Sequence, residues 1–195
     1  MSDLRIGVIV GSTRPGRVGK QVADWVLDRA SARGDARYEL IDLADFTLPH
    51  LDEANSPILG LYEKEHTKKW AATIARYDGY VFVTPEYNRS IPGTLKNAID
   101  FLYAEWNDKA AGIVSYGGAV SGARAAEHLR LILAELQVAD VRQPVLFSTI
   151  TDFEDYTVFK EPAAYHVAAL EVQLDQLVAW ATALRSVRAG AASAA

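Results

Sequence analysis

Short apolar runs alternate with amphipathic stretches along almost the whole chain. The apolar runs lie at 4–10, 38–43, 80–84, 110–115 and 141–147. Between and after them, apolar residues recur every three or four positions at about 16–33, 63–76, 94–106, 125–136 and 164–186. Runs of the first kind are typical of buried parallel strands, and the second kind is typical of helices that pack one face on a sheet. The pattern predicts five strands that alternate with five helices.

This alternation restricts the topology of the sheet. Neighbouring parallel strands are joined by right-handed helical crossovers, so we expect an α/β three-layer sandwich with a five-stranded, doubly wound parallel sheet. With 195 residues, 50% of them hydrophobic, the chain is long enough for one well-filled domain. We expect that domain to span 1–188. We expect disorder in 189–195, whose small side chains have nothing to bury.

Charge and composition narrow the possible partners. The net charge of −5 argues against nucleic acid, which is usually bound through a basic patch. The chain has no cysteine, which excludes disulfides, thiolate metal sites and cysteine nucleophiles. No apolar run approaches the roughly 18 residues of a membrane span, and the first residues lack the pattern of a secretion signal. We therefore predict a cytoplasmic protein that binds neither nucleic acid nor membrane.

A glycine-rich loop follows the first predicted strand. Its sequence is Gly11-Ser12-Thr13-Arg14-Pro15-Gly16-Arg17-Val18-Gly19-Lys20. Such a loop leaves backbone N–H groups free to converge on a ligand, and the following helix points its positive end at the same place. Cations are unfavourable at the start of a helix unless an anion binds there, so the two arginines strengthen this interpretation. The loop predicts a phosphate site.

Two common phosphate motifs do not fit this loop. Gly11 and Gly16 have the P-loop spacing, but Arg17 and Val18 replace the Lys and the Ser or Thr of that motif. The Rossmann pattern G-x-G-x-x-G is absent, although Asp42 ends the second strand, where it could bind a ribose or cap a turn. A terminal phosphomonoester remains, held by hydroxyl, guanidinium and backbone N–H groups. The predicted residues are Ser12, Thr13, Arg14, Gly16, Arg17, Val18 and Gly19.

Two further loops rich in Gly, Pro, Ser and Tyr follow the third and fourth predicted strands. They cover 85–93 and 116–122. In a sheet of order 2-1-3-4-5, strands one, three and four are neighbours, and ligands bind beyond their carboxyl ends. One ligand would therefore contact all three loops.

Three motifs together resemble the NAD(P)H-dependent FMN reductase family. They are Gly11-Ser12-Thr13-Arg14, the long run Pro85-Glu86-Tyr87-Asn88 with Ile91-Pro92-Gly93-Thr94-Leu95-Lys96-Asn97-Ala98-Ile99-Asp100, and Ser115-Tyr116-Gly117-Gly118. The resemblance covers about 4–148, and the second motif is far more specific than a lone glycine loop. It implies a flavodoxin-like fold, FMN as cofactor, and two-electron reduction of flavins, quinones or other small acceptors by NADPH or NADH. The expected kinetics are ping-pong.

By the same resemblance, the two later motifs hold the flavin ring. The residues placed along the isoalloxazine are Pro85, Glu86, Tyr87 and Asn88. Those placed at the ring edge that becomes negative on reduction are Ser115, Tyr116, Gly117 and Gly118. Hydride transfer to a flavin needs no protein nucleophile or general acid, so we predict no catalytic side chain. The four histidines are scattered without ligand spacing, and we predict no metal site.

Members of this family are commonly homodimers or homotetramers, and the resemblance implies the same here. Phe101, Tyr103 and Trp106 lie too close in sequence for one helix face to hide them, so we expect some of this aromatic surface to be buried against a second subunit. Two other functions remain open on the sequence alone. One is a flavodoxin-like carrier that passes single electrons to a protein partner, and the other is a non-catalytic sensor of a phosphate ligand.

Overall fold

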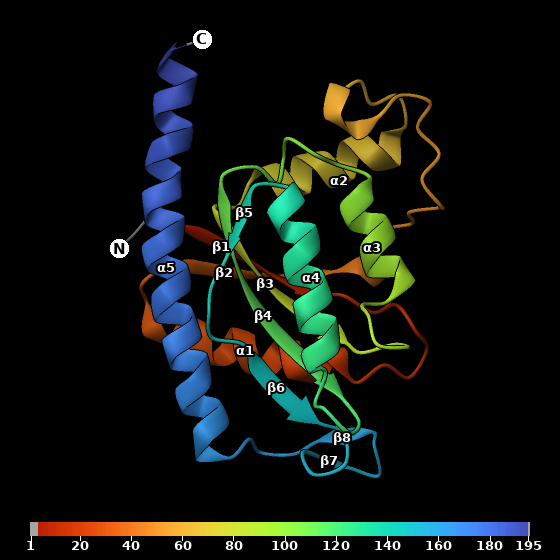
Figure 1. The fold of residues 1–195 in the computed structure, drawn as a ribbon, viewed down its shortest axis with the longest axis vertical. Coiled ribbons are helices and arrows are strands. Elements are labelled where there is room, and N and C mark those ends of the chain that lie inside the picture. Colours follow the sequence, from red (N-terminus) through yellow and green to blue (C-terminus); the bar gives the residue numbers. More distant parts are fainter. Residues whose placement is uncertain (1–3, 195) are drawn as a thin grey trace.

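The computed structural model describes residues 4–194, and its centre is a parallel sheet. The four long strands are β1 (Arg5–Val10), β2 (Arg37–Asp42), β3 (Gly79–Pro85) and β4 (Lys109–Gly117). They lie in the order β2-β1-β3-β4 (Figure 1), which confirms the predicted arrangement. Val10 pairs with Val83, and Pro85 pairs with Tyr116. The carboxyl ends of β1, β3 and β4 are therefore neighbours.

The fifth position of the sheet is divided between two short strands. β5 (Val138–Asp140) pairs with the start of β4, and β6 (Val145–Ser148) pairs with its end. Between them, Pro144 has no N–H group to donate to a neighbouring strand. The N–H of Gln143 donates to the Gln176 side chain instead. The single strand predicted for 141–147 is therefore wrong in its bounds, although it occupies the predicted place.

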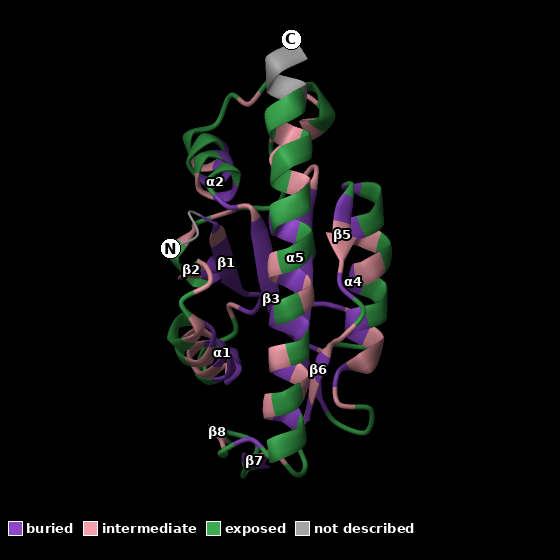
Figure 2. Ribbon diagram, turned by 90° about the vertical axis from the view of Figure 1, so that its left-hand side faces the viewer, coloured by how far each residue is buried: buried purple, intermediate pink, exposed green. Residues whose placement is uncertain are grey.

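Helices cover both faces of the sheet (Figures 1 and 2). They are α1 (Gly19–Arg33), α2 (Glu65–Ala75), α3 (Gly93–Asp100), α4 (Ala123–Glu135) and α5 (Ala164–Ala194). α2, α3 and α4 share one core with the sheet, and α1 and α5 share the other. Figure 2 shows the buried side of α5 against the sheet and its exposed side facing outward. This is the predicted three-layer sandwich.

Two short 3₁₀ helices interrupt the long connection from β2 to α2. They are η1 (Leu43–Asp45) and η2 (Pro57–Leu59). Ile58, Leu59 and Leu61, which lie in or beside η2, are about 60% exposed. Within residues 4–194, no helix combines the length and the apolar character that a membrane span requires.

Three helices differ in their bounds from the prediction. α1 begins at Gly19 rather than near 16, because residues 14–17 form a turn. α3 ends at Asp100 rather than near 106. α5 continues to Ala194 rather than ending near 186, so it includes most of the segment 189–195 for which disorder is predicted. Alanine has the highest helix propensity, which favours this extension, and residue 195 lies outside the described residues.

The early end of α3 changes the environment of the aromatic residues that follow it. Phe101 and Trp106 are fully buried in the core of this chain, and Trp106 Nε1 donates to Ile99 O over 3.2 Å. Tyr103 is only partly exposed. The expectation that a second subunit covers this surface is wrong for Phe101 and Trp106, because the chain turns inward after Asp100 and buries both rings itself. For Tyr103 it stays a prediction.

A buried lysine lies at the start of β4, far along that strand from its carboxyl end. Lys109 is 4% exposed, and its Nζ donates over 2.9 Å to both Ile74 O and Tyr80 Oη. Burial, assisted by the nearby charge of Arg188, lowers the pKa of Lys109 to about 7. The unfolded chain therefore binds more protons than the folded one at pH values above 7.

We expect stability to rise with pH above 7 because of Lys109. A lysine pKa that is lowered on folding makes the free energy of unfolding increase between the folded and unfolded pKa values. Relative to Lys109→Met, the wild type should gain about 2 kcal/mol between pH 7 and pH 9. Urea denaturation at both pH values measures this. The exposed Lys68→Met should show no such difference, and parallel behaviour of wild type and Lys109→Met would contradict the prediction.

Candidate functional site

The loops that follow β1, β3 and β4 border a cavity of about 240 Å³. Eight of the predicted site residues line it: Arg14, Val18, Pro85, Glu86, Tyr87, Tyr116, Gly117 and Gly118. Thr149 and Tyr156, which the sequence analysis did not single out, complete the lining. The sheet order thus brings the three loops around one space beyond the strand ends.

The loop between β1 and α1 forms a tight turn. The N–H of Arg17 donates to Arg14 O over 3.1 Å, and Gly16 has a φ of 71°, in the left-handed region that favours glycine. α1 has neither a side-chain cap nor an acidic residue in its first turn. No acidic side chain neutralises the positive dipole end of α1, which therefore favours an anion. Arg14 is exposed beside it.

Arg17 has a different environment from Arg14. Its Nη2 lies 2.5 Å from Asp42 Oδ2, in a pair whose side chains are only 20% and 8% exposed. Asp42 also caps η1 by accepting from the N–H of Ala44 over 3.0 Å, so the capping alternative for Asp42 is confirmed. The Nε of Arg17 is buried and has no hydrogen-bond partner within residues 4–194. A donor of this kind is costly unless a ligand accepts from it.

Tyr87 connects the first loop to the second. Its hydroxyl lies 3.3 Å from Ser12 Oγ and accepts from Arg14 Nε over 3.2 Å. Ser12 is 1% exposed, so its hydroxyl lies beneath the loop surface rather than on it. Tyr87 itself is 37% exposed. The Tyr87 side chain therefore links the loop between β1 and α1 to the wall of the cavity.

The second loop is held by a tight turn at its tip. Tyr87 and Ser90 exchange two backbone hydrogen bonds of 2.8 and 2.9 Å. Between them, Asn88 and Arg89 have φ values of 48° and 70°. Asn88 is exposed at this tip and does not line the cavity. Its predicted place along a ring stays a prediction.

The carboxylate of Glu86 contacts Arg124 at the start of α4. It accepts from Arg124 Nε over 2.6 Å and from the Arg124 backbone N–H over 3.2 Å, and it forms an ion pair with Arg124 Nη2. The Glu86 side chain is 7% exposed. The N–H of Glu86 donates to Tyr116 O over 2.8 Å. Glu86 therefore fixes the second loop to the third, and an acid at the start of a helix is favourable there.

Tyr116 spans the site from the end of β4 to the start of α1. A Cβ added at Gly19 would lie 2.6 Å from Tyr116 Oη, so only glycine allows this approach. Burial raises the pKa of Tyr116, which keeps the hydroxyl protonated. β4 extends to Gly117, so Ser115 lies within the strand as predicted, whereas Tyr116 and Gly117 belong to the strand and not to the predicted loop 116–122.

Gly122 lies close against the backbone at the end of β4, where the third loop begins. It has a φ of 80° and precedes α4, and a Cβ there would lie 2.7 Å from Tyr116 N and 2.9 Å from Ser115 Oγ. Ser115 is fully buried, and its Oγ has no hydrogen-bond partner in the described part of the chain. By contrast, a Cβ at Gly118 would meet nothing within 4 Å. The backbone at Gly118 therefore borders open space.

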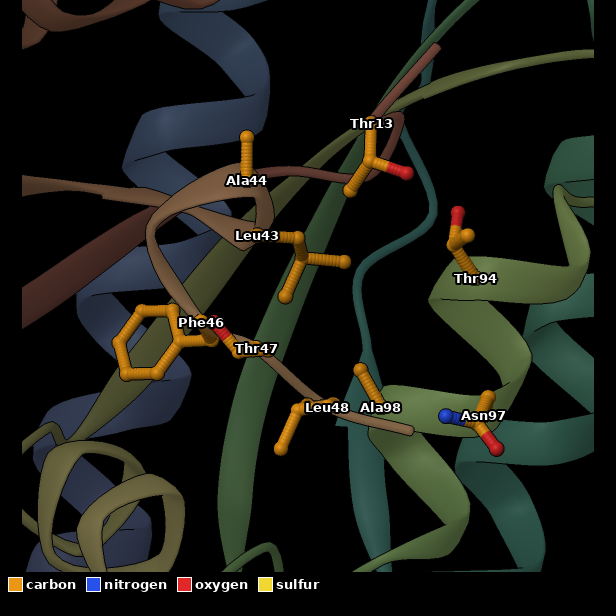
Figure 3. A pocket seen from close by; sticks show the side chains of 9 residues that line it. All are labelled: Thr13, Leu43, Ala44, Phe46, Thr47, Leu48, Thr94, Asn97 and Ala98. Carbon is orange, nitrogen blue, oxygen red and sulfur yellow. The ribbon is translucent and has the colours of Figure 1, made fainter. Parts of the chain in front are cut away.

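A larger cavity of about 330 Å³ lies beside the first loop (Figure 3). Figure 3 shows Thr13 at its top, segment 43–48 along one side, and Thr94 and Asn97 of α3 along the other. None of its nine lining residues is charged. The predicted residue Thr13 therefore faces this second space and not the cavity between the three loops. We assign no phosphate to it.

A small hairpin, not foreseen from the sequence, lies at the same end of the sheet. Its strands are β7 (Phe153–Glu154) and β8 (Val158–Phe159), and Figure 1 shows it beyond the carboxyl end of β6. Strands of two residues are too short to show alternation, so no periodic signal could reveal them. The hairpin carries Tyr156 to the cavity.

Comparisons with known proteins agree with this geometry. The model of a family described as NADPH-dependent FMN reductase matches residues 4–152. The chain is 42% identical over 157 residues to the NAD(P)H-dependent FMN reductase ntnL of Nectria sp, covering 76% of this chain and 78% of that protein. It is 30% identical over 188 residues to 2-hydroxy-1,4-benzoquinone reductase of Burkholderia sp, covering 91% and 96%.

A solved structure shows the same fold. The flavoenzyme NAD(P)H:(acceptor) oxidoreductase FerB from Paracoccus denitrificans matches with a TM-score of 0.67 and 24% identity. The match covers 89% of this chain and 97% of that chain. The arrangement of strands and helices is therefore shared.

Proposed function

This chain belongs to the NADPH-dependent FMN reductase family, and we propose that its three loops hold the flavin with the phosphate on the β1–α1 loop and the ring in the 240 Å³ cavity. The protein is an NAD(P)H-dependent oxidoreductase that uses FMN and acts on flavin or quinone acceptors. The observation that carries the proposal is the convergence of the three loops on one space whose far end is the uncapped start of α1.

The residues present fit both halves of FMN. At the phosphate end, the exposed Arg14 and the unpartnered Nε of Arg17 flank the open N-terminus of α1. At the ring end, Pro85 and Tyr87 offer one wall, and the backbone at Gly118 borders open space that a planar group can approach.

When bound, FMN supplies the two-electron chemistry, accepting hydride from NAD(P)H and passing the electrons to the acceptor. The chain binds and orients it. Gly117 and Gly118 line the cavity, and fixed backbone N–H groups at this place would stabilise negative charge without reorganising. Glu86 is paired with Arg124, so its carboxylate acts by fixing two loops and not as a general base at the cavity. The Tyr116 hydroxyl stays protonated, and its close approach to Gly19 packs the end of β4 against the start of α1.

Kinetics test whether donor and acceptor share this one cavity. If NAD(P)H and the acceptor use the same open side in turn, initial rates measured with NADPH at several menadione concentrations should give parallel double-reciprocal lines. Intersecting lines would show that both substrates bind at once, which would contradict a single shared site. Repeating the series with NADH identifies the preferred donor.

We also propose that the chain forms a homo-oligomer, although not through Phe101 or Trp106, which the chain itself buries. Ile58, Leu59 and Leu61 form an exposed apolar cluster in the β2–α2 connection, and clusters of this kind often mark interfaces. Sedimentation at micromolar concentration should show a dimer or larger. A monomer would contradict this, and a Leu59→Glu, Leu61→Glu variant that remains oligomeric would place the interface elsewhere.

A further inference from the structure

Tyr156 is an exposed aromatic residue on the wall of the cavity. It lies at the tip of the β7–β8 hairpin and lines the same space as Tyr87, Gly117 and Gly118. Its side chain is 67% exposed, so the core does not stabilise it there. A large ring in this position needs an explanation other than packing.

The backbone at Tyr156 is unfavourable for its residue type. The N–H of Thr157 donates to Glu154 O over 2.9 Å, and the two residues between them, Asp155 and Tyr156, have φ values of 46° and 59°. Two consecutive left-handed residues are the mark of a type I′ turn, which favours Asn-Gly or Asp-Gly. A bulky residue at such a φ is uncommon, and strain of this kind concentrates at functional sites.

The hairpin is anchored, so the tip is held in this conformation and place. The Gln21 side chain of α1 donates to Thr157 O and accepts from the N–H of Phe159, both over 2.9 Å. Phe153 packs on Tyr116 with ring centroids 6.0 Å apart. Phe159 also packs on Phe147 of β6 at 4.9 Å. These contacts fix the hairpin to α1, β4 and β6.

We propose that Tyr156 is a binding residue of the site, whose ring packs against a planar aromatic ligand in the cavity. Tyr87 and Tyr156 both line the space, so two rings are available for stacked or edge contacts with a flat guest. The inference rests on the proposed function. That function offers two guests of the same chemistry, the isoalloxazine of FMN and a planar quinone acceptor.

The test compares Tyr156→Gly with Tyr156→Phe. Glycine leaves the Asp-Gly pair that this turn favours, so the apoprotein should melt about 2–4 °C higher than the wild type. Loss of the ring should raise the dissociation constant of a planar guest roughly 3- to 10-fold. Tyr156→Phe keeps the ring and should bind like the wild type. Tyr165→Ala, which removes another tyrosine of similar exposure, should not alter binding.

Two titrations separate the possible guests. Fluorescence titration of apoprotein with FMN reports the flavin, and titration of oxidised holoenzyme with menadione, without NAD(P)H, reports the acceptor. A weaker FMN affinity in Tyr156→Gly assigns the ring to the flavin, and a weaker menadione affinity alone assigns it to the acceptor. If both affinities equal those of the wild type, the inference is wrong while the proposed function stands. If the wild type itself retains no FMN, both the inference about Tyr156 and the proposed function are wrong.

Discussion

Gly122→Ala should lower the free energy of unfolding by about 2–5 kcal/mol, the largest effect we expect from a single methyl group. A left-handed residue other than glycine costs roughly 1–2 kcal/mol, and overpacking adds about 1–3 kcal/mol. Both apply, because Gly122 has a φ of 80° and the new Cβ would lie 2.7 Å from Tyr116 N. The backbone of the third loop must shift to relieve this contact. FMN binding should therefore weaken as well.

Gly34→Ala is the matched control for this change. Gly34 ends α1 with a φ of 70°, but a Cβ there would meet nothing within 4 Å. It should show the conformational cost alone, about 1–2 kcal/mol, with FMN affinity unchanged. Thermal melts and FMN titrations of the two variants measure both effects. If Gly122→Ala is no more destabilised than Gly34→Ala, the close approach beneath the third loop is not a constraint.

Arg14→Ala should weaken FMN binding by about 1–3 kcal/mol, or roughly 5- to 150-fold in Kd. Arg14 is exposed beside the open start of α1, whereas Arg17 is already paired with Asp42. Arg14 is thus the guanidinium with most freedom to meet the phosphate. Titration of the apoprotein with FMN measures the loss, and Arg142→Ala, at an exposed position away from the three loops, should leave Kd unchanged.

Riboflavin distinguishes a direct phosphate contact from an indirect effect. Arg14 Nε also donates to Tyr87 Oη, so removing Arg14 releases Tyr87 from one partner. If Arg14 acts on the phosphate, Arg14→Ala weakens FMN but not riboflavin, and Tyr87→Phe does not reproduce the loss. Equal loss for both ligands would show that Arg14 acts by holding Tyr87 at the ring.

The sequence was sufficient to predict the architecture and the meeting of the three loops around one cavity. Apolar runs such as 80–84 are buried on both faces, which only a central parallel strand requires, and strand order then brings the three loops together. The glycine loop after β1 carries its own signal, because glycines and arginines at a helix start are unusual without an anion. These features depend on local patterns, which one sequence displays.

Side-chain partners could not be predicted in the same way. Nothing local pairs Glu86 with Arg124, 38 residues later, or seats Tyr116 against Gly19. Such pairs depend on how loops from different strands meet. The burial of Trp106 was missed because the periodic pattern continued beyond the true end of α3. The hairpin that carries Tyr156 has strands too short for any period.

The most direct test of the account is a visible absorption spectrum of the purified protein after incubation with FMN and desalting, followed by anaerobic addition of NADPH or NADH. We expect a flavin spectrum to persist after desalting, and we expect at least one of the two nucleotides to bleach it rapidly. Retained flavin that neither nucleotide bleaches would point to an electron carrier. Failure to retain flavin even at high FMN concentration would contradict the assignment of the three loops to this cofactor.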